Sequence, residues 1–202
     1  IDENLFDYLV TEVEGGTLKI YPKSIKKGFN NNSYDLRPTV YKIKSNSKEL
    51  KELNTVGSGS VISSIPTNVN RMEINMAGSG NVELRGPVKG YKLECNMAGS
   101  GNIIAKDIQL DNLSCSLASS GEIEVIGTVD RASFNVAGSG EIKAFDCQAR
   151  KAECNIASSG EISVYATQIL DANIVGSGEI HYKGDPEISK SIMGSGSINK
   201  VK

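Results

Sequence analysis

The sequence predicts an all-β protein: a single-stranded, right-handed parallel β-helix (solenoid) of about eight rungs of 18–21 residues, with an N-terminal cap of strands and a short helix. Three observations predict this fold. A glycine-rich corner recurs, the period between corners is nearly fixed, and apolar and polar residues alternate on both sides of each corner. The corner has four positions: a small residue, then Gly or Ser, then Ser, and finally Gly. Its closing glycines are 21, 21, 20, 19, 20, 18 and 18 residues apart: Gly59, Gly80, Gly101, Gly121, Gly140, Gly160, Gly178 and Gly196.

Each repeat contains a strand before its corner. Counted from the closing glycine, the apolar positions lie eight residues before it (Met72, Leu93, Leu113, Ala132, Ala152, Leu170), six before (Ile74, Cys95, Cys115, Phe134, Cys154, Ala172) and four before (Met76, Met97, Leu117, Val136, Ile156, Ile174, Ile192). The intervening positions are polar. This period of two predicts a strand with one buried and one wet face.

A second strand follows each corner by the same logic. Two residues past the glycine stand Val61, Val82, Ile103, Ile123, Ile142, Ile162, Ile180 and Ile198. The rest of each repeat varies in length and carries turn formers such as Gly86-Pro87 and Gly184-Asp185-Pro186, which indicates a short third side. A unit of about 20 residues is too short for a propeller blade and lacks the leucine-rich signature. Right-handed coiling is expected because parallel crossovers are overwhelmingly right-handed.

Residues 1–53 are expected to form a cap region continuous with the repeats of residues 54–202. Apolar residues at helical offsets predict a short helix over residues 2–10. The Gly15-Gly16 pair then predicts a hairpin between residues 10–14 and 17–21. Residues 22–35 are expected to be a mobile loop, and residues 39–44 a strand.

Composition excludes several classes of function. The net charge is −2, aromatic residues are 5% of the chain and Trp is absent. A weak, mixed charge disfavours nucleic acid as a partner, and few aromatic rings disfavour a deep aromatic cleft. No apolar run is long enough for a transmembrane helix, and residues 1–20 lack the pattern of a secretory signal. The start without Met favours a trimmed or processed chain.

Two polar columns are expected to be structural. Every corner has a Ser before its closing glycine, from Ser58 to Ser195, and we expect glycine to supply positive φ while Ser Oγ bonds the backbone. Five residues before the glycine stand Asn54, Asn75, Asn96, Asn135, Asn155 and Asn173. Stacked amides bond along many cross-β assemblies, so we expect a stabilising ladder rather than a ligand surface.

A column of carboxylates follows four consecutive corners: Glu122, Glu141, Glu161 and Glu179. Neighbouring carboxyl groups would lie about 5 Å apart. That separation resembles a retaining glycosidase pair, but equivalent carboxylates lack the unequal environments that separate an acid from a base. A solvated acidic stripe is the favoured interpretation; a divalent-cation or basic-partner site and catalysis remain alternatives.

Four further residues fall at positions on the same face of these strands as the glutamates. Lys143 and His181 lie three residues past the glycine, and Phe145 and Tyr165 lie five past it. The two rings either stack outward beside the carboxylates or turn inward where the strand ends. With the four glutamates they form the predicted ligand-binding set. No cofactor and no metal site are expected, since His181 has no second His or Cys at ligand spacing.

The cysteines are expected to be core residues with reduced thiols. Cys95, Cys115 and Cys154 fall in the inward column, where Phe134 and Ile74 substitute for them. A disulfide between Cys95 and Cys115 is conceivable on adjacent rungs, although parallel side chains fit its torsion poorly. Cys147 has no assigned place.

Two features of the sequence are found together in a known family. One is the N-terminal segment Asn4-Leu5-Phe6-Asp7-Tyr8-Leu9-Val10-Thr11-Glu12-Val13-Glu14-Gly15-Gly16-Thr17-Leu18-Lys19-Ile20, and the other is the repeated Gly-Ser-Gly-(Asn/Glu)-Ile that follows it. In this combination the chain resembles the auto-transporter adhesin head domain called the GIN domain, common in Bacteroidetes. The resemblance implies an exported, right-handed β-helix in the periplasm or at the cell surface, with adhesion as its role and no catalytic residues to carry over. The chain departs from the family by starting partway into its N-terminal strands.

The leading hypothesis is therefore a non-enzymatic, extracytoplasmic scaffold that binds a glycan or protein ligand. One alternative is a polysaccharide lyase or hydrolase that uses the stacked carboxylates. Another is a structural unit that self-assembles through open solenoid ends, forming a homo-oligomer.

Overall fold

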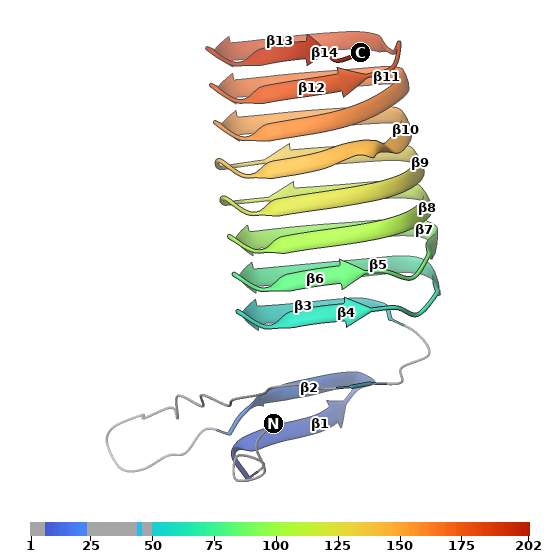
Figure 1. Cartoon of the computed structure of the whole chain (residues 1–202), viewed down its shortest axis with the longest axis vertical. Coiled ribbons are helices and arrows are strands. Elements are labelled where there is room, and N and C mark those ends of the chain that lie inside the picture. The colour runs from blue at the N-terminus through green and yellow to red at the C-terminus, as the bar shows by residue number, and fades with distance from the viewer. Residues whose placement is uncertain (1–6, 24–43, 46–49) are drawn as a thin grey trace, which may run out of the picture. The chain divides into compact units, whose positions relative to one another are not determined.

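The structure, a computed structural model, describes residues 7–23, 44–45 and 50–202. The chain divides into two compact units, residues 1–46 and 47–202 (Figure 1). Of the described residues, 77% lie in strands and none lies in an α-helix, so the fold is all-β. The prediction of an all-β solenoid is confirmed. No segment of the described residues is a helix long and apolar enough to span a bilayer.

The N-terminal unit contains a β-hairpin. Strands β1 (Leu9–Glu14) and β2 (Thr17–Pro22) pair antiparallel, and Gly15 and Gly16 form the turn with φ of 58° and 81°. The predicted hairpin is thus confirmed. The predicted helix is wrong for residues 9 and 10, which open β1 because cross-strand pairing outweighs their helical spacing. Residues 1–6, most of the predicted loop and nearly all of the predicted strand over 39–44 lie outside the described residues.

The second unit is a parallel solenoid of about seven turns (Figure 1). Its strands are β3 (Glu52–Gly57), β4 (Ser60–Ser63), β5 (Thr67–Gly78), β6 (Asn81–Leu84), β7 (Val88–Gly99), β8 (Asn102–Leu117), β9 (Glu122–Val136), β10 (Glu141–Ser158), β11 (Glu161–Gly176), β12 (Glu179–Lys183), β13 (Glu187–Gly194) and β14 (Ser197–Lys200). Each rung pairs in parallel with the next, one repeat further along the chain. The longer strands, such as β10, bend around the rung and contribute to more than one side.

The core is one continuous apolar column inside the rungs. The register pairs Ile142 with Ile162 and Ile162 with Ile180, and all three are fully buried. The predicted columns before the corner are buried in the same way from the second rung to the seventh. The short third side adds buried residues of its own, among them Ile108 and Cys147. Three inward-facing sides therefore close around the axis, as the variable third segment predicted.

Six of the eight corners contain two glycines, which have different roles, and Ser119 and Ser158 replace the first glycine in the other two. The first takes positive φ, as at Gly78 (139°), whereas the closing glycine does not. A Cβ at the closing Gly101 would lie 2.0 Å from the carbonyl oxygen of Gly80 on the preceding rung, so stacking leaves no room for a side chain. The corner Ser hydroxyls make no hydrogen bond within residues 50–202, contrary to expectation. Their backbone amides bond instead, as from Ser79 N to Gly57 O at 3.0 Å.

Candidate functional site

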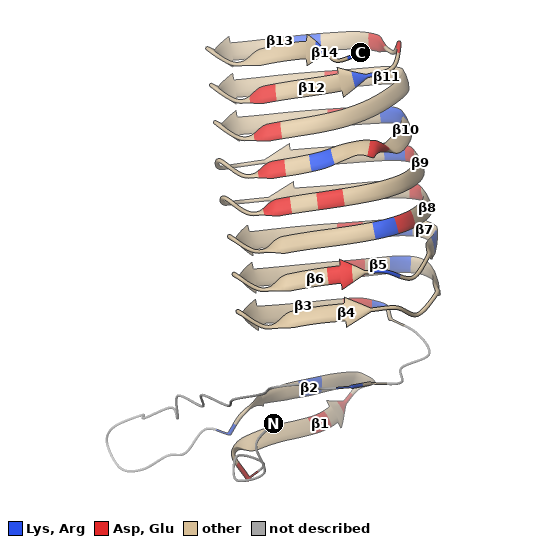
Figure 2. Ribbon diagram, viewed as in Figure 1, with Lys and Arg blue, Asp and Glu red and all other residues tan. Residues whose placement is uncertain are grey.

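We call the outward surface of the strands that follow the corners the post-corner face. All eight residues of the predicted ligand-binding set belong to these strands. The register pairs Glu122 with Glu141, Glu141 with Glu161 and Glu161 with Glu179, so the four carboxylates form one column across β9 to β12. Figure 2 shows this acidic column at the start of the four strands. Its side chains are between about a third and a half exposed.

Two basic side chains lie among the carboxylates of this column. Lys143 Nζ lies 2.6 Å from Glu122 Oε2 and 3.5 Å from Glu141 Oε2. The hydrogen bond to Glu122 raises the pKa of Lys143. Two rungs further on, His181 Nε2 lies 3.1 Å from Glu179 Oε2 and 3.6 Å from Glu161 Oε1. Lys143 and His181 therefore each lie between two carboxylates, so every carboxylate of the column has a basic side chain within 4 Å.

Beside these charges lies an aromatic strip. Phe145 and Tyr165 are half-buried, and Lys183 Nζ lies 4.5 Å from the centre of the Phe145 ring. An ammonium over the ring places it at the surface, since the core column here is occupied by Ala144 and Val164. Of the two orientations open from sequence, the structure has the outward one, with part of the Phe145 ring covered.

A strand irregularity positions the strip. The pairing of β10 with β11 passes from Ala144–Val164 directly to Gln148–Tyr165, so residues 145–147 have no partner in β11. This bulge bends the strand from the post-corner face onto the third side. Cys147 points into the core there and Phe145 stays outside. Sequence reasoning could not place Cys147 because the bulge interrupts the period of two.

The carboxylates of the post-corner face form neither a metal cluster nor an unequal pair. No group of three or more His, Cys, Asp or Glu among the described residues is arranged to hold a metal ion. The glutamates are equivalent in register and are bridged by Lys143 or His181, so no pair has the contrast between a buried acid and an exposed base. The arrangement is instead typical of a contact surface, with exposed charges around a partly exposed ring.

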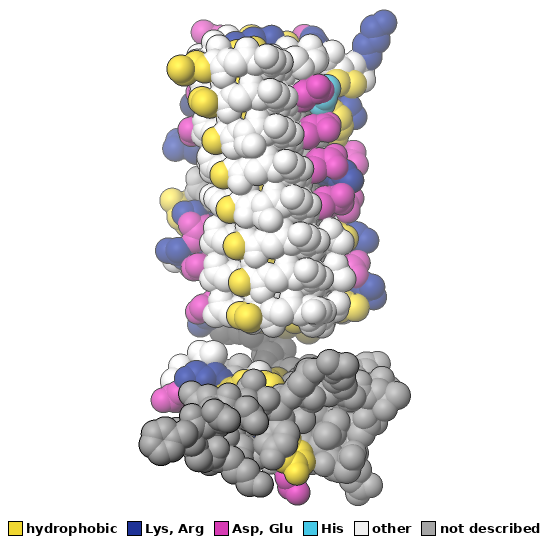
Figure 3. Space-filling view, turned by 90° about the vertical axis from the view of Figure 1, so that its left-hand side faces the viewer, with side chains coloured by type: hydrophobic (Ala, Val, Ile, Leu, Met, Phe, Trp, Pro, Cys, Tyr) yellow, Lys and Arg dark blue, Asp and Glu magenta, His cyan; other side chains and the backbone are white. Residues whose placement is uncertain are grey.

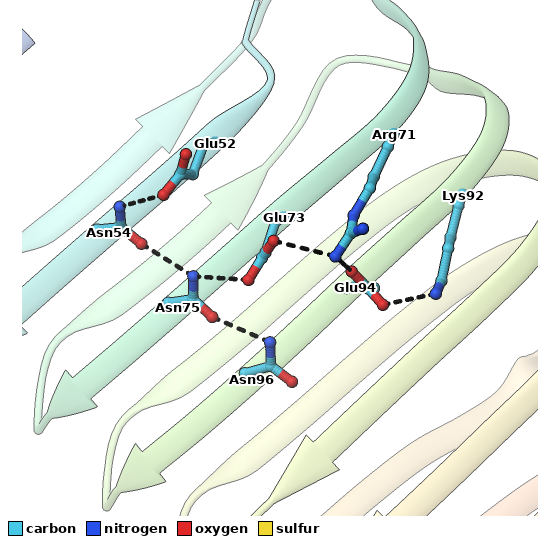
Figure 4. Close-up of polar contacts among 8 residues, drawn as sticks. All are labelled: Glu52, Asn54, Arg71, Glu73, Asn75, Lys92, Glu94 and Asn96. Carbon is cyan, nitrogen blue, oxygen red and sulfur yellow. Dashed lines mark hydrogen bonds and ion pairs between the residues drawn. The ribbon is translucent and has the colours of Figure 1, made fainter. Parts of the chain in front are cut away.

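The Asn column is a structural ladder, as expected. Asn75 donates to Asn54 and Asn96 donates to Asn75, each at 2.9 Å (Figure 4). A second ladder joins Asn135, Asn155 and Asn173 at 3.0 Å per step. Ser116 separates the two ladders. These amides bond to one another, which leaves them less capacity for a ligand.

Ion pairs support the first ladder. Arg71 contacts both Glu73, at 3.4 Å, and Glu94 on the next rung, and Lys92 lies 2.6 Å from Glu94 (Figure 4). The hydrogen bond from Lys92 is the main reason that the pKa of Glu94 is lowered. Arg71, Glu73, Lys92 and Glu94 are therefore paired with one another within the protein.

The structure also contains an apolar groove that the sequence reasoning missed. It lies on the outward surface of the strands before the corners and has a volume of about 320 Å³. Its lining comprises Ser116, Leu117, Ala118, Asn135, Val136, Ala137, Asn155, Ile156, Ala157, Asn173 and Val175. The sequence does contain an indication of this groove, because apolar residues recur at a solvent-facing position three residues before each closing glycine. They are Val56, Ala77, Ala98, Ala118, Ala137, Ala157, Val175 and Met193. Figure 3 shows this apolar column along the solenoid, with the acidic column to its right.

All four cysteines are free and buried. Cys95 pairs in register with Cys115, and no disulfide joins them. Burial raises the pKa of Cys147 to about 12 and that of Cys154 further. These thiols pack as core residues and are not available as nucleophiles.

The model of the family described as "Putative auto-transporter adhesin, head GIN domain" matches residues 1–86 and 73–186. The chain belongs to this family. A crystal structure from Parabacteroides distasonis, described as a putative lipid binding protein, is 98% identical to this GIN domain, with a TM-score of 0.96. That comparison covers 100% of this chain and 82% of the other.

Two further structures are similar to this GIN domain, and both are described as putative adhesins. One, from Parabacteroides merdae, is 31% identical with a TM-score of 0.90, covering 100% of this chain and 81% of the other. The second, from Parabacteroides distasonis, is 29% identical with a TM-score of 0.89, covering 99% and 81%. No curated protein matches the chain.

Proposed function

We propose that this GIN domain is a non-enzymatic, extracytoplasmic adhesion domain that binds a glycan or protein ligand through its post-corner face. The observation that carries the proposal is the outward surface of β9 to β12, where the register gathers four carboxylates with Lys143 and His181, and where Phe145 and Tyr165 lie half-buried on the same strands. The family description and the names of the relatives at 31% and 29% identity support an adhesive role and a location outside the cytoplasm.

The chemistry of the face supports binding over turnover. Its charges form pairs, Lys143 with Glu122 at 2.6 Å and His181 with Glu179 at 3.1 Å, that a ligand can exchange for its own groups. Tyr165 supplies a rigid ring between them. Aromatic residues bordered by exposed charges are enriched in recognition surfaces.

A glycan and matrix-protein array tests the proposal. The wild-type chain should bind at least one class of ligand, and the Phe145→Ala/Tyr165→Ala double variant should lose that signal. Tyr91→Ala is the matched control, because Tyr91 is a half-exposed ring outside the predicted set. Equal binding by wild type and double variant, or no binding by the wild type at all, would remove the proposed role.

A second candidate function is the binding of an apolar ligand in the groove. It is supported by the small outward-facing side chains of Ala118, Ala137 and Ala157 in its lining, and by the description of the 98% identical relative as a putative lipid binding protein. Fluorescent fatty-acid binding tests it. Ala137→Leu fills the groove and should abolish the signal, whereas Ala77→Leu, in the same column outside the groove lining, should leave it unchanged. Loss in both variants or in neither would reject the groove.

A further inference from the structure

In the last rung, lysine replaces apolar residues at two positions of the core columns. Register places Lys190 over Ala172 and Lys200 over Tyr182. Ala172 is completely buried in its column, and the same column holds only apolar residues in the earlier rungs. Lysine thus occupies two positions whose equivalents along the solenoid point inward.

Lys190 lies across the end of the core. Its Nζ atom is 3.4 Å from the carbonyl oxygen of Ile198, on the other side of the same rung. The same ammonium lies 5.2 Å from the centre of the Tyr182 ring, one rung below. A side chain that begins on β13 therefore reaches β14 and covers the residue beneath it, with its charge at the open end.

Lys200 is held at the opposite edge. Its ammonium contacts Asp185 in the turn between β12 and β13. The remaining inward positions of the last rung are Ile188, Ile192 and Ile198, and Ile192 is 43% exposed where Ile174 beneath it is 1% exposed. Without the two lysines this rung would present an apolar strand edge, which is the surface that a further strand adds to.

We propose that Lys190 and Lys200 close the last rung against a further strand, so that this end of the solenoid does not accept a second copy of the chain. A strand added on β13 and β14 would bury the Lys190 ammonium, which contacts a carbonyl oxygen and a ring, against an apolar layer without a carboxylate, and would take the Lys200–Asp185 ion pair out of water. Inward-pointing lysines protect exposed sheet edges in this way. The proposal opposes the self-assembly alternative and is independent of which ligand the post-corner face binds.

Light scattering coupled to size-exclusion chromatography tests the proposal over a series of protein concentrations. Wild type should keep one molar mass throughout. Lys190→Ile/Lys200→Val should show a mass that rises with concentration by about twofold or more, as expected for isologous pairing. The matched control is Lys89→Ile/Lys151→Val, which removes two charges from the sides of the solenoid and should behave as wild type. Lys190→Arg/Lys200→Arg keeps both charges and should also stay at the wild-type mass.

Circular dichroism establishes that each variant is folded before its mass is compared. A folded Lys190→Ile/Lys200→Val variant that stays at the wild-type mass would overturn the proposal. Hydrogen exchange of the wild type gives a second readout that needs no variant. The amides of β13 should exchange at a rate independent of protein concentration, and slower exchange at high concentration would show that this edge pairs despite its lysines.

Discussion

Asn155 donates its side-chain amide to Asn135 Oδ1 at 3.0 Å and accepts one from Asn173 at the same distance, so one residue joins three consecutive rungs. Each of these bonds links positions about 20 residues apart, which local propensity cannot do. The ladder fixes the register of the same rungs that carry the post-corner face. The hydrogen bonds on one side of the solenoid thereby help to align the candidate site on the other.

Replacing Asn155 should weaken the fold by a measurable amount. Asn155→Ala removes two inter-rung bonds and one to Glu153, and we expect a loss of about 1–3 kcal/mol in the free energy of unfolding at roughly 1 kcal/mol per bond. Urea denaturation measures it as a lower midpoint. Asn199→Ala is the control, since Asn199 bonds only within its rung, to Ser197. Equal midpoints for both variants would mean that the ladder adds no stability.

Replacing a closing glycine by alanine should have different effects on stability at different rungs. Gly101→Ala places a Cβ 2.0 Å from Gly80 O and should cost about 2 kcal/mol or more, because stacked backbones cannot move apart locally. Gly59→Ala meets nothing within 4 Å and should leave stability nearly unchanged. Thermal unfolding of the two variants checks the difference. Similar melting temperatures would show that stacking does not select glycine here.

The buried thiols predict a loss of stability in alkali. Burial raises the pKa of Cys147 from 9.0 to about 12, so above pH 9 the unfolded chain releases a proton that the folded chain retains. The contribution of this thiol to the free energy of unfolding is fully present below pH 9. It should fall as pH rises toward 12, by about 1.4 kcal/mol per pH unit. Urea midpoints at about pH 9 and pH 10 measure it, before lysines titrate. Cys147→Ala should reduce the slope, and an unchanged slope would contradict the assignment.

The ion pairs of Glu94 predict the opposite dependence in acid. Lys92 and Arg71 lower the pKa of Glu94 below 4.5, so this carboxylate stabilises the fold above that pH and loses its effect as pH falls through the folded value. Glu94→Gln should be less stable than wild type by up to about 1 kcal/mol at neutral pH. The difference should vanish in acid. A gap that persists to the lowest pH at which both proteins stay folded would show that packing, rather than charge, is lost.

Much of the fold could be predicted from sequence, because aligning the repeats shows which residues pair between neighbouring rungs. Once the closing glycines are aligned, Ile142 must stack on Ile162 and Glu141 on Glu161, and the structure agrees. The helix predicted over residues 2–10 was wrong at residues 9 and 10, because a hairpin partner such as Tyr21 for Val10 is not visible in helical offsets. The positive φ at the first corner glycine, rather than the closing one, also required coordinates.

The candidate site was predictable as a set of positions but not as a set of contacts. Register brings Lys143 near Glu122, yet its bridging of two carboxylates depends on side-chain conformation. The bulge after Ala144 interrupts the alternation, so sequence could not decide the orientation of Phe145. The groove was missed because Ala137 and its equivalents read as inconspicuous small residues on a wet face. Its depth arises only when several of them stack.

The most direct test of the central claim is the affinity of the chain for a ligand taken from the array, measured by calorimetry for variants on the two faces. The account predicts that Tyr165→Ala weakens binding about tenfold or more, in the range of a contact-surface aromatic, while Ala137→Leu binds as the wild type does. Unchanged affinity in Tyr165→Ala together with lost binding in Ala137→Leu would contradict it and assign the ligand to the apolar groove.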